Sequence, residues 1–201
     1  MTRQGSFEPD LDRWNAWTPV EVADRLRGVR ATWYVLAGWA VDLFLGRQTR
    51  LHDDLEIGVP AQGFPAIRDA LGDLELFVVG DGRAWPLTES ALGSHFQTWG
   101  RERTTGVWRV DIVREPWDGD AWAYRRDPRI RLPRSRLIEQ SVDGIPYVRP
   151  EVVLLFKAKA TRSKDEADFA QALPRLDAAR RLWLRGALEL AHPGHHWLNE
   201  L

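Results

Sequence analysis

Three acidic side chains on two predicted strands are the residues of this sequence best suited to do chemistry. Asp54 and Glu56 flank Leu55, and because successive side chains of a strand point to opposite faces, both acids are expected on one face. Asp111 lies in a later predicted strand, where alternation places it on the face opposite Trp108. If the two strands are neighbours, the three carboxylates converge, an arrangement that proteins tolerate mainly where a cation binds.

Hard oxygen ligands of this kind suit magnesium, which takes its remaining ligands from water and substrate phosphates. We therefore predict Asp54, Glu56 and Asp111 as metal ligands, with Asp111 also the candidate general base toward an attacking hydroxyl. Phosphoryl-type transfer requires mostly positioning and charge neutralisation from a protein. An acid-x-acid pair alone is also typical of a solvated strand face, so the prediction depends on the elements around it.

The segment before the acids supplies a turn and positive charge. Ala37-Gly38 precedes a predicted helix over residues 39–45, and the free N–H groups at a helix start are suited to docking a triphosphate. Arg47 and Arg50 follow that helix and are close enough in sequence to the acids to add positive charge. Together the turn, the helix and the acids predict a nucleotide-binding metal site.

Composition excludes several other classes of protein. The net charge is −1 over 201 residues, whereas a binder of duplex nucleic acid usually has a basic face. There is no cysteine for disulfides, thiolate metal sites or a nucleophile, and no apolar run approaches the roughly 20 residues of a membrane span. Residues 1–14 lack the apolar core of a secretory signal, so we expect a cytoplasmic protein. The 11 tryptophans are expected to pack at half-buried seams between two small lobes.

Alternating strand and helix patterns predict an α/β (α+β) fold with a mixed sheet and flanking helices. We predict an α/β lobe over residues 1–115, a β/loop bridge over 116–149 and a helical lobe over 150–201. The predicted strands are 33–36, 54–59, 74–79, 95–99 and 107–113; the predicted helices are 19 to about 28, 39–45, 64–71, 151–160, 164–173 and 178–191; residues 116–136 are predicted irregular and 141–145 a hairpin turn.

Several short motifs resemble the nucleotidyltransferase superfamily, and more narrowly the aminoglycoside 2″- and lincosamide nucleotidyltransferases. That branch reads G-G-W-[AG]-[VI]-D, then L-G-[RK], then T/Q-R-x-H-x-D-[IL]-[DE], which matches Gly38–Asp42, Leu45–Arg47 and Thr49–Glu56. Glu151–Lys157 resembles the family's first helix after the α/β lobe. Arg162–Asp168 resembles an R-x-K-D-x-x-D motif of related proteins, including the toxin–antitoxin branch.

The resemblance implies a nucleotidyltransferase-like sheet with a small C-terminal helical lobe. It implies transfer of a nucleoside monophosphate from a nucleoside triphosphate, ATP, to a hydroxyl of a small aminoglycoside- or lincosamide-like acceptor, with release of pyrophosphate. By position it implies Asp54 and Glu56 as magnesium ligands, and Asp111 as ligand or base. It places Gly38 at the phosphate-binding turn, and Arg47 and Arg50 match family positions and are predicted to bind the nucleotide.

A basic stretch between two predicted helices contains Lys157, Lys159, Arg162 and Lys164. One interpretation is a clamp on the triphosphate, and the other is a solvated helix face whose charges pair with nearby aspartates. The resemblance favours nucleotide binding for Lys159 and Lys164, and the solvated face is favoured for the other two.

Two positions depart from the family pattern. Ala37 replaces the first glycine, which a protein tolerates unless that position requires a positive φ or close approach of a phosphate. Glu56 replaces an aspartate that is common in the antibiotic-modifying members, and its extra methylene shifts the carboxylate in a site of strict geometry. Two alternatives therefore stay open: a same-fold protein acting on tRNA or protein in a toxin–antitoxin role, and a non-catalytic nucleotide-binding descendant. Neither duplex nucleic acid nor a membrane is predicted as a partner.

Overall fold

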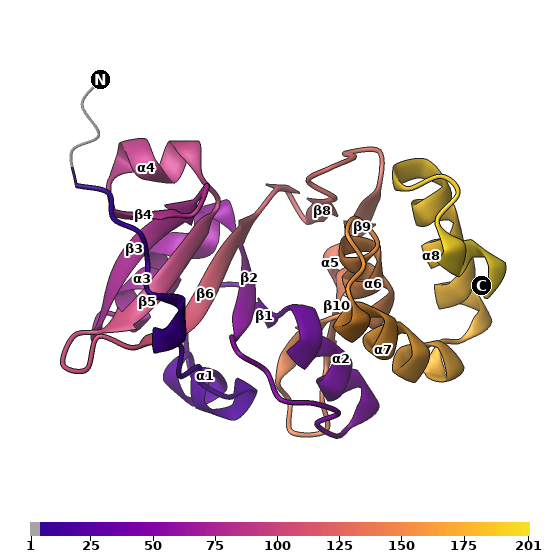
Figure 1. The fold of residues 1–201 in the computed structure, drawn as a ribbon, viewed down its shortest axis with the longest axis horizontal. Helices are drawn as coiled ribbons and strands as arrows, with labels where there is room; N and C mark the ends of the chain where they lie inside the picture. Colours follow the sequence, from indigo (N-terminus) through magenta and orange to yellow (C-terminus); the bar gives the residue numbers. More distant parts are fainter. Residues whose placement is uncertain (1–4) are drawn as a thin grey trace. The chain divides into compact units, whose positions relative to one another are not determined.

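The computed structural model describes residues 5–201, which form two compact units (Figure 1). Unit 1 contains the described residues up to Val35 together with His52–Glu115, and unit 2 contains Leu36–Leu51 together with Pro116–Leu201. The predicted lobe over 1–115 begins in residues 1–4, which lie outside the described residues. Leu36–Leu51, which we included in that lobe, clusters with the C-terminal residues instead.

Unit 1 is built on a mixed sheet whose strands follow the order β1-β2-β6-β5-β3-β4. The strands β2 and β6 are parallel, and the other neighbours in this series are antiparallel, which confirms the predicted mixed sheet. The strand bounds are β1 Tyr34–Val35, β2 Glu56–Pro60, β3 Leu74–Gly80, β4 Arg83–Pro86, β5 Gln97–Glu102 and β6 Trp108–Glu115.

The helices of unit 1 include the predicted first helix, which begins with a capping box. The Thr18 hydroxyl accepts from the Glu21 N–H at 3.3 Å, and the Glu21 carboxylate accepts from the Thr18 N–H at 2.7 Å. The helix buries Val22 completely. The helix bounds are α1 Pro19–Arg25, α3 Phe64–Ala70 and α4 Glu89–Ser94, with short 3-10 helices η1 Leu11–Arg13 and η2 Ala61–Gly63.

A bulge in β6, opposite Gly100 and Arg101 of β5, changes which face of the sheet one tryptophan occupies. Trp99 pairs with Asp111 across β5 and β6, and the register shifts after Gly100. The Trp108 ring lies 5.4 Å from that of Trp99 and 5.8 Å from that of Phe77, centroid to centroid. Trp108 therefore packs on the same face as Asp111, and the prediction of opposite faces is wrong because a bulge interrupts the alternation.

Unit 2 is mainly helical and also contains two small β-structures. The segment predicted irregular forms a three-stranded sheet, β7-β8-β9, whose strands are too short to show alternation in the sequence. In Figure 1 the helix α2 lies against α6 and α7. The element bounds are α2 Ala37–Leu45, β7 Trp117–Asp118, β8 Ala121–Ala123, β9 Arg131–Pro133, α5 Arg134–Leu137, β10 Ile138–Gln140, β11 Pro146–Val148, α6 Pro150–Lys157, α7 Ser163–Ala172, η3 Leu173–Arg175, α8 Ala178–Ala191 and η4 His196–Asn199.

An ion-pair network connects the elements of unit 2. Arg180 of α8 contacts Glu139 of β10 at 2.5 Å, and Arg149 contacts Glu151 of α6 at 2.9 Å. Burial raises the pKa of Glu151, although both arginines oppose that shift. Within residues 5–201, no helix has the length and apolar character to cross a membrane.

Candidate active site

The strand register brings two of the three predicted acids side by side. Glu56 of β2 is the direct partner of Asp111 of β6 in the parallel pair, and the Asp111 N–H donates to the carbonyl of Leu55 at 2.8 Å. Neighbouring strands lie about 4.8 Å apart, and partner side chains share a face. Asp54 lies two residues before the start of β2 and is exposed, so the strand begins later than predicted. The predicted convergence of Glu56 and Asp111 is thus a feature of the fold.

The side chain of Asp111 is almost completely buried beside an aromatic cluster. Its residue is 4% exposed, and its strand partner Trp99 contacts the ring of Trp14 at 5.1 Å. Burial raises the pKa of Asp111 well above its ordinary value, and the charges of Glu56 and Asp54 raise it further. The side chains of Gln97 and Trp99 oppose this shift by favouring the charged form.

One oxygen of Asp111 has a partner and the other has none among the described residues. The Gln97 side-chain amide donates to Oδ2 at 2.7 Å, whereas Oδ1 is buried without a hydrogen bond. A buried carboxylate oxygen without a partner is costly unless a ligand satisfies it. Gln97 was not predicted, because a single glutamine in a strand carries no sequence signal of function.

The acids fit a magnesium ion in chemistry, although they do not form a complete ligand shell. Across residues 5–201, no group of three or more His, Cys, Asp or Glu side chains is gathered so as to hold a metal ion. Glu56 and Asp111 nevertheless offer hard oxygen ligands and repel each other, and Oδ1 of Asp111 is buried without a hydrogen bond among the described residues. Magnesium usually binds through one or two carboxylates plus waters and substrate phosphates, so a small protein ligand set suits it.

The first residue of α2 lies in unit 2 and is strained, and it is the position that departs from the family pattern. Ala37 has a φ of +53°, in the left-handed region that glycine adopts freely. Gly38 follows it, buried, in the first turn of the nine-residue helix α2. The helix ends at Gly46 with a φ of +72°, as predicted. The condition under which Ala37 was expected to matter, a positive φ, is therefore met.

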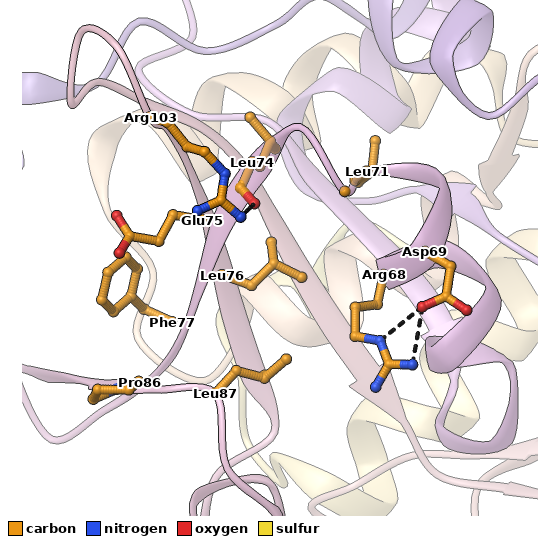
Figure 2. A pocket seen from close by; sticks show the side chains of 11 residues that line it. Arg68, Asp69, Leu71, Leu74, Glu75, Leu76, Phe77, Pro86, Leu87 and Arg103 are labelled. Atoms are coloured by element: carbon orange, nitrogen blue, oxygen red, sulfur yellow. Dashed lines mark hydrogen bonds and ion pairs between the residues drawn. The ribbon is translucent and has the colours of Figure 1, made fainter.

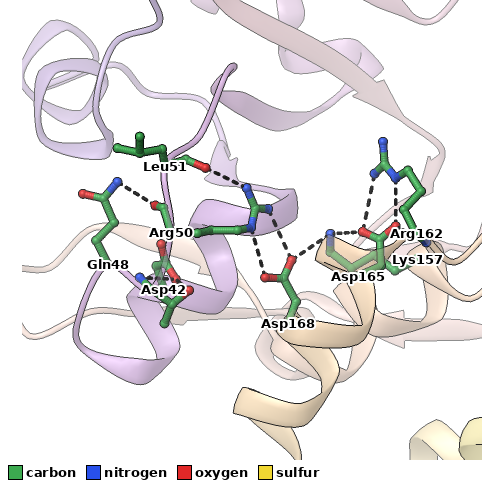
Figure 3. Close-up of polar contacts among 9 residues, drawn as sticks. Asp42, Gln48, Arg50, Leu51, Lys157, Arg162, Asp165 and Asp168 are labelled. Carbon is green, nitrogen blue, oxygen red and sulfur yellow. Dashed lines mark hydrogen bonds and ion pairs between the residues drawn. The ribbon is translucent and has the colours of Figure 1, made fainter.

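The predicted nucleotide-binding residue Arg50 contacts an acid of its own unit (Figure 3). Its Nε lies 3.2 Å from Oδ1 of Asp168, which is 2% exposed. Lys157 Nζ reaches both Asp168, at 2.9 Å, and Asp165, at 2.6 Å, and Arg162 adds a contact of 2.9 Å to Asp165. Although burial opposes it, hydrogen bonds from Arg162 and Lys157 hold the pKa of Asp165 below its ordinary value. The expectation of a solvated face is wrong for Lys157, because its ammonium group lies in a buried cluster.

The remaining predicted nucleotide-binding side chains also lie in unit 2. The Arg47 guanidinium donates to Gln171 at 2.8 Å. Lys159 follows α6, Lys164 lies in the first turn of α7, and both residues are exposed. Nucleotide binding by these four basic residues, Arg50 included, stays a prediction.

Two residues of the matched motifs have a structural role that the sequence did not reveal. The Asp42 carboxylate is buried and accepts from both the backbone N–H of Thr49, at 3.1 Å, and its hydroxyl, at 2.6 Å. This contact fixes the loop after α2 against the helix that precedes it. Both residues lie within the segments that match the family, but that match does not show that their side chains contact each other.

A cavity of about 580 Å³ in unit 1 is separate from the acids (Figure 2). It is lined by the end of α3 and by β3 and β4, with Leu71 and Leu76 among its apolar side chains and the Arg68–Asp69 pair at its edge. Neither β2 nor β6 contributes to its lining. The cavity is therefore not the site formed by Glu56 and Asp111.

Comparisons with known proteins support the predicted resemblance. A family model described as aminoglycoside-2''-adenylyltransferase matches residues 20–98, which include Asp54 and Glu56 and end before Asp111. The chain is similar to the lincosamide antibiotic adenylyltransferase LnuA with lincomycin bound, at 18% identity and a TM-score of 0.54 over 76% of this chain and 92% of that one. No curated protein sequence matches the chain.

Two structures of ANT(2'')-Ia are also similar. The solution structure is 16% identical with a TM-score of 0.55, over 86% of this chain and 88% of that one. The complex with adenylyl-2''-tobramycin is 14% identical with a TM-score of 0.56, over 86% and 94%. The chain has the nucleotidyltransferase fold. The predicted fold class is confirmed by these structures, and the partial match of the family model supports the resemblance to the antibiotic-modifying branch.

The strain at Ala37 predicts that Ala37→Gly stabilises the protein. Relief of a left-handed alanine is worth about 1–2 kcal/mol, from which the greater freedom of glycine in the unfolded chain removes part. We expect a net gain of up to about 1 kcal/mol in the free energy of unfolding, measured by urea denaturation. Ala40→Gly in the same helix is the matched control and should destabilise. A loss of stability in Ala37→Gly would show that the turn is not strained.

The buried acid of the Arg50 cluster predicts that Asp168→Asn destabilises the protein. Removing one partner leaves Arg50 and Lys157 without their shared counter-charge, at a cost of about 3 kcal/mol. Thermal unfolding measures this loss. Asp118→Asn is the control because Asp118 forms an exposed pair with Arg131, 83% and 44% accessible, and should change stability by less than about 1 kcal/mol. Equal losses of stability in Asp168→Asn and Asp118→Asn would contradict a buried network.

The raised pKa of Asp111 predicts that Asp111→Asn stabilises the metal-free protein. Above pH 3.8 the unfolded chain loses this proton while the folded protein retains it, so stability falls as pH rises toward the folded pKa. Asparagine does not titrate, so the difference in stability between variant and wild type should widen with pH across that window. Chemical denaturation in chelator at several pH values measures it. A wild type as stable as the variant at every pH would contradict a raised pKa.

Proposed function

We propose that this protein is a magnesium-dependent nucleotidyltransferase that moves a nucleoside monophosphate from ATP to a hydroxyl of a small acceptor of the aminoglycoside or lincosamide kind. The observation that carries the proposal is the parallel register of Glu56 with Asp111, with Asp54 two residues upstream, on a nucleotidyltransferase fold. Carboxylates side by side on one face of a sheet repel each other, and a divalent cation relieves that repulsion.

Asp54, Glu56 and Asp111 would hold the magnesium ion. When bound, magnesium would neutralise charge on the triphosphate and orient it. Asp111 is proposed as ligand and as general base, because Oδ1 is the oxygen left without a hydrogen bond and because its burial gives the carboxylate a high affinity for protons. Glu56 is a ligand whose greater length adjusts where its carboxylate lies.

The nucleotide would be bound by groups of unit 2. The backbone N–H groups at Gly38 are suited to phosphate oxygens, and Lys159 and Lys164 are exposed cations able to meet a triphosphate. Arg47 and Arg50 each already contact a side chain within unit 2. Their proposed role is therefore to fix the loop after α2 and to contribute positive electrostatic potential, and not to bind the phosphate by themselves.

The acceptor class rests on the relatives. The LnuA structure contains lincomycin and one ANT(2'')-Ia structure contains adenylyl-2''-tobramycin. The alternative of a tRNA or protein acceptor draws on the R-x-K-D-x-x-D motif, yet Asp165 and Asp168 of that motif are engaged with Lys157 inside unit 2. These contacts give the two aspartates a structural role within unit 2.

The proposal predicts adenylyl transfer that depends on the acids. Purified protein is incubated with magnesium, labelled nucleoside triphosphates and a panel of aminoglycosides and lincosamides, and pyrophosphate and labelled product are measured. Glu56→Gln and Asp111→Asn should each lower the rate at least about a hundredfold, because charge stabilisation of this kind is lost. Asp53→Asn removes the same charge one residue away from Asp54 and should retain activity.

The length of the side chain at position 56 is a second arm of the same experiment. Glu56→Asp restores the residue of the antibiotic-modifying pattern and should keep or raise the rate if the site binds metal. A collapse of activity in Glu56→Asp would assign Glu56 another role. If no acceptor or triphosphate yields product and Asp54→Ala leaves nucleotide binding unchanged, the chain is a non-catalytic descendant and the proposal is wrong.

A further inference from the structure

Gln97 stands at the start of β5 with its side chain directed at Asp111. In the register of β5 and β6, Gln97 pairs with Val113, and Val113 lies two residues beyond Asp111 on the same face. The amide therefore reaches along that face, and its Nε2 donates to Asp111 Oδ2 at 2.7 Å. The geometry is that of a strong hydrogen bond to a carboxylate.

The contact divides the two oxygens of Asp111 into different roles. Oδ2 is occupied by the amide, whereas Oδ1 is buried and has no hydrogen bond within the described residues. A carboxylate held at one oxygen cannot rotate freely about its terminal torsion, so the direction of the other oxygen is fixed as well. Oδ1 is then presented as a single ligand atom on the face that also carries Glu56.

The residue type at this position is as informative as the distance. An arginine or lysine would satisfy Asp111 with an ion pair and would cancel the negative charge that attracts a cation. A neutral amide donates one hydrogen bond, orients the carboxylate and leaves its charge in place. The backbone of Gln97 pairs with Val79 of β3 and Val113 of β6, so the strand itself does not need this side chain.

We propose that Gln97 is a positioning residue for the metal site, which holds Asp111 so that Oδ1 binds the divalent cation as a single oxygen ligand. The inference rests on the proposed function and adds to it a residue outside the three acids. A partner of a metal ligand typically changes metal affinity 10- to 100-fold when it is removed. Gln97 acts through Asp111 and has no role of its own in the chemistry.

The test measures binding of Mn²⁺ alone, as a probe for magnesium, by electron paramagnetic resonance on the nucleotide-free protein. Gln97→Met keeps the length of the side chain and removes the donor. We expect its Mn²⁺ affinity to fall about 10- to 100-fold with little change in the thermal unfolding of the metal-free protein. In the transfer assay, the magnesium concentration for half-maximal rate should rise, and kcat should recover at high magnesium.

Matched variants separate the outcomes. Gln62→Met makes the same exchange at an exposed position of η2 and should bind Mn²⁺ like the wild type. Gln97→Asn keeps the amide but shortens the side chain by one methylene, so its Mn²⁺ affinity should fall as it does in Gln97→Met. It replaces Gln97→Met in the test if that variant does not fold. Reduced thermal stability of the metal-free protein together with no recovery at high magnesium would assign Gln97 a structural role and overturn the inference.

The failure of this inference differs from failure of the proposed function. If Asp111→Asn abolishes Mn²⁺ binding while Gln97→Met leaves it unchanged, the metal site stands and the positioning role of Gln97 is wrong. If neither Asp111→Asn nor Glu56→Gln alters Mn²⁺ binding, the acids are not a metal site, and both proposals fall.

Discussion

The parallel pairing of β2 with β6 is the constraint on which the rest of unit 1 depends. It places two carboxylates side by side on the same face of the sheet, one from each strand. Glu56 and Asp111 repel each other at strand spacing, so the pairing must be stabilised elsewhere. The opposite face supplies that stabilisation, since Leu55, Ile57 and Ile112 are completely buried. In this short alternating stretch, the side chains on one face of the strand pack in the core, and those on the other face form the candidate site.

The aromatic cluster beside the acids keeps water away from Asp111, which raises the pKa of its carboxyl group. Trp99 pairs with Asp111, and the rings of Trp14 and Trp108 pack against it, so the carboxylate is shielded from water on that side. Shielding raises the pKa of Asp111 and strengthens its attraction to any cation, because both effects follow from removal of water. A stability cost at functional residues is common in enzymes. The bulge after Gly100 is what allows Trp108 to join this face.

The sequence predicted those parts of the molecule that depend on local signals. The capping box at Thr18, the glycine at the end of α2 and the alternation around Glu56 are each specified within a few neighbouring residues. The bulge that turns Trp108 and the contact of Gln97 with Asp111 depend on strand register between distant segments, which no local pattern encodes. The strands of unit 2 were missed because two or three residues are too few to show a period.

The basic residues of unit 2 show why charge in a sequence is not charge available to a ligand. Asp168 and Asp165 are buried, and a buried carboxylate is stable only with a partner, so Arg50 and Lys157 are engaged with them. A motif that contains both acidic and basic residues can therefore form an internal ion-pair cluster, and its basic residues are then engaged before any ligand binds. By this argument, a motif cation becomes a candidate for the triphosphate only when its side chain is exposed and no buried acid contacts it.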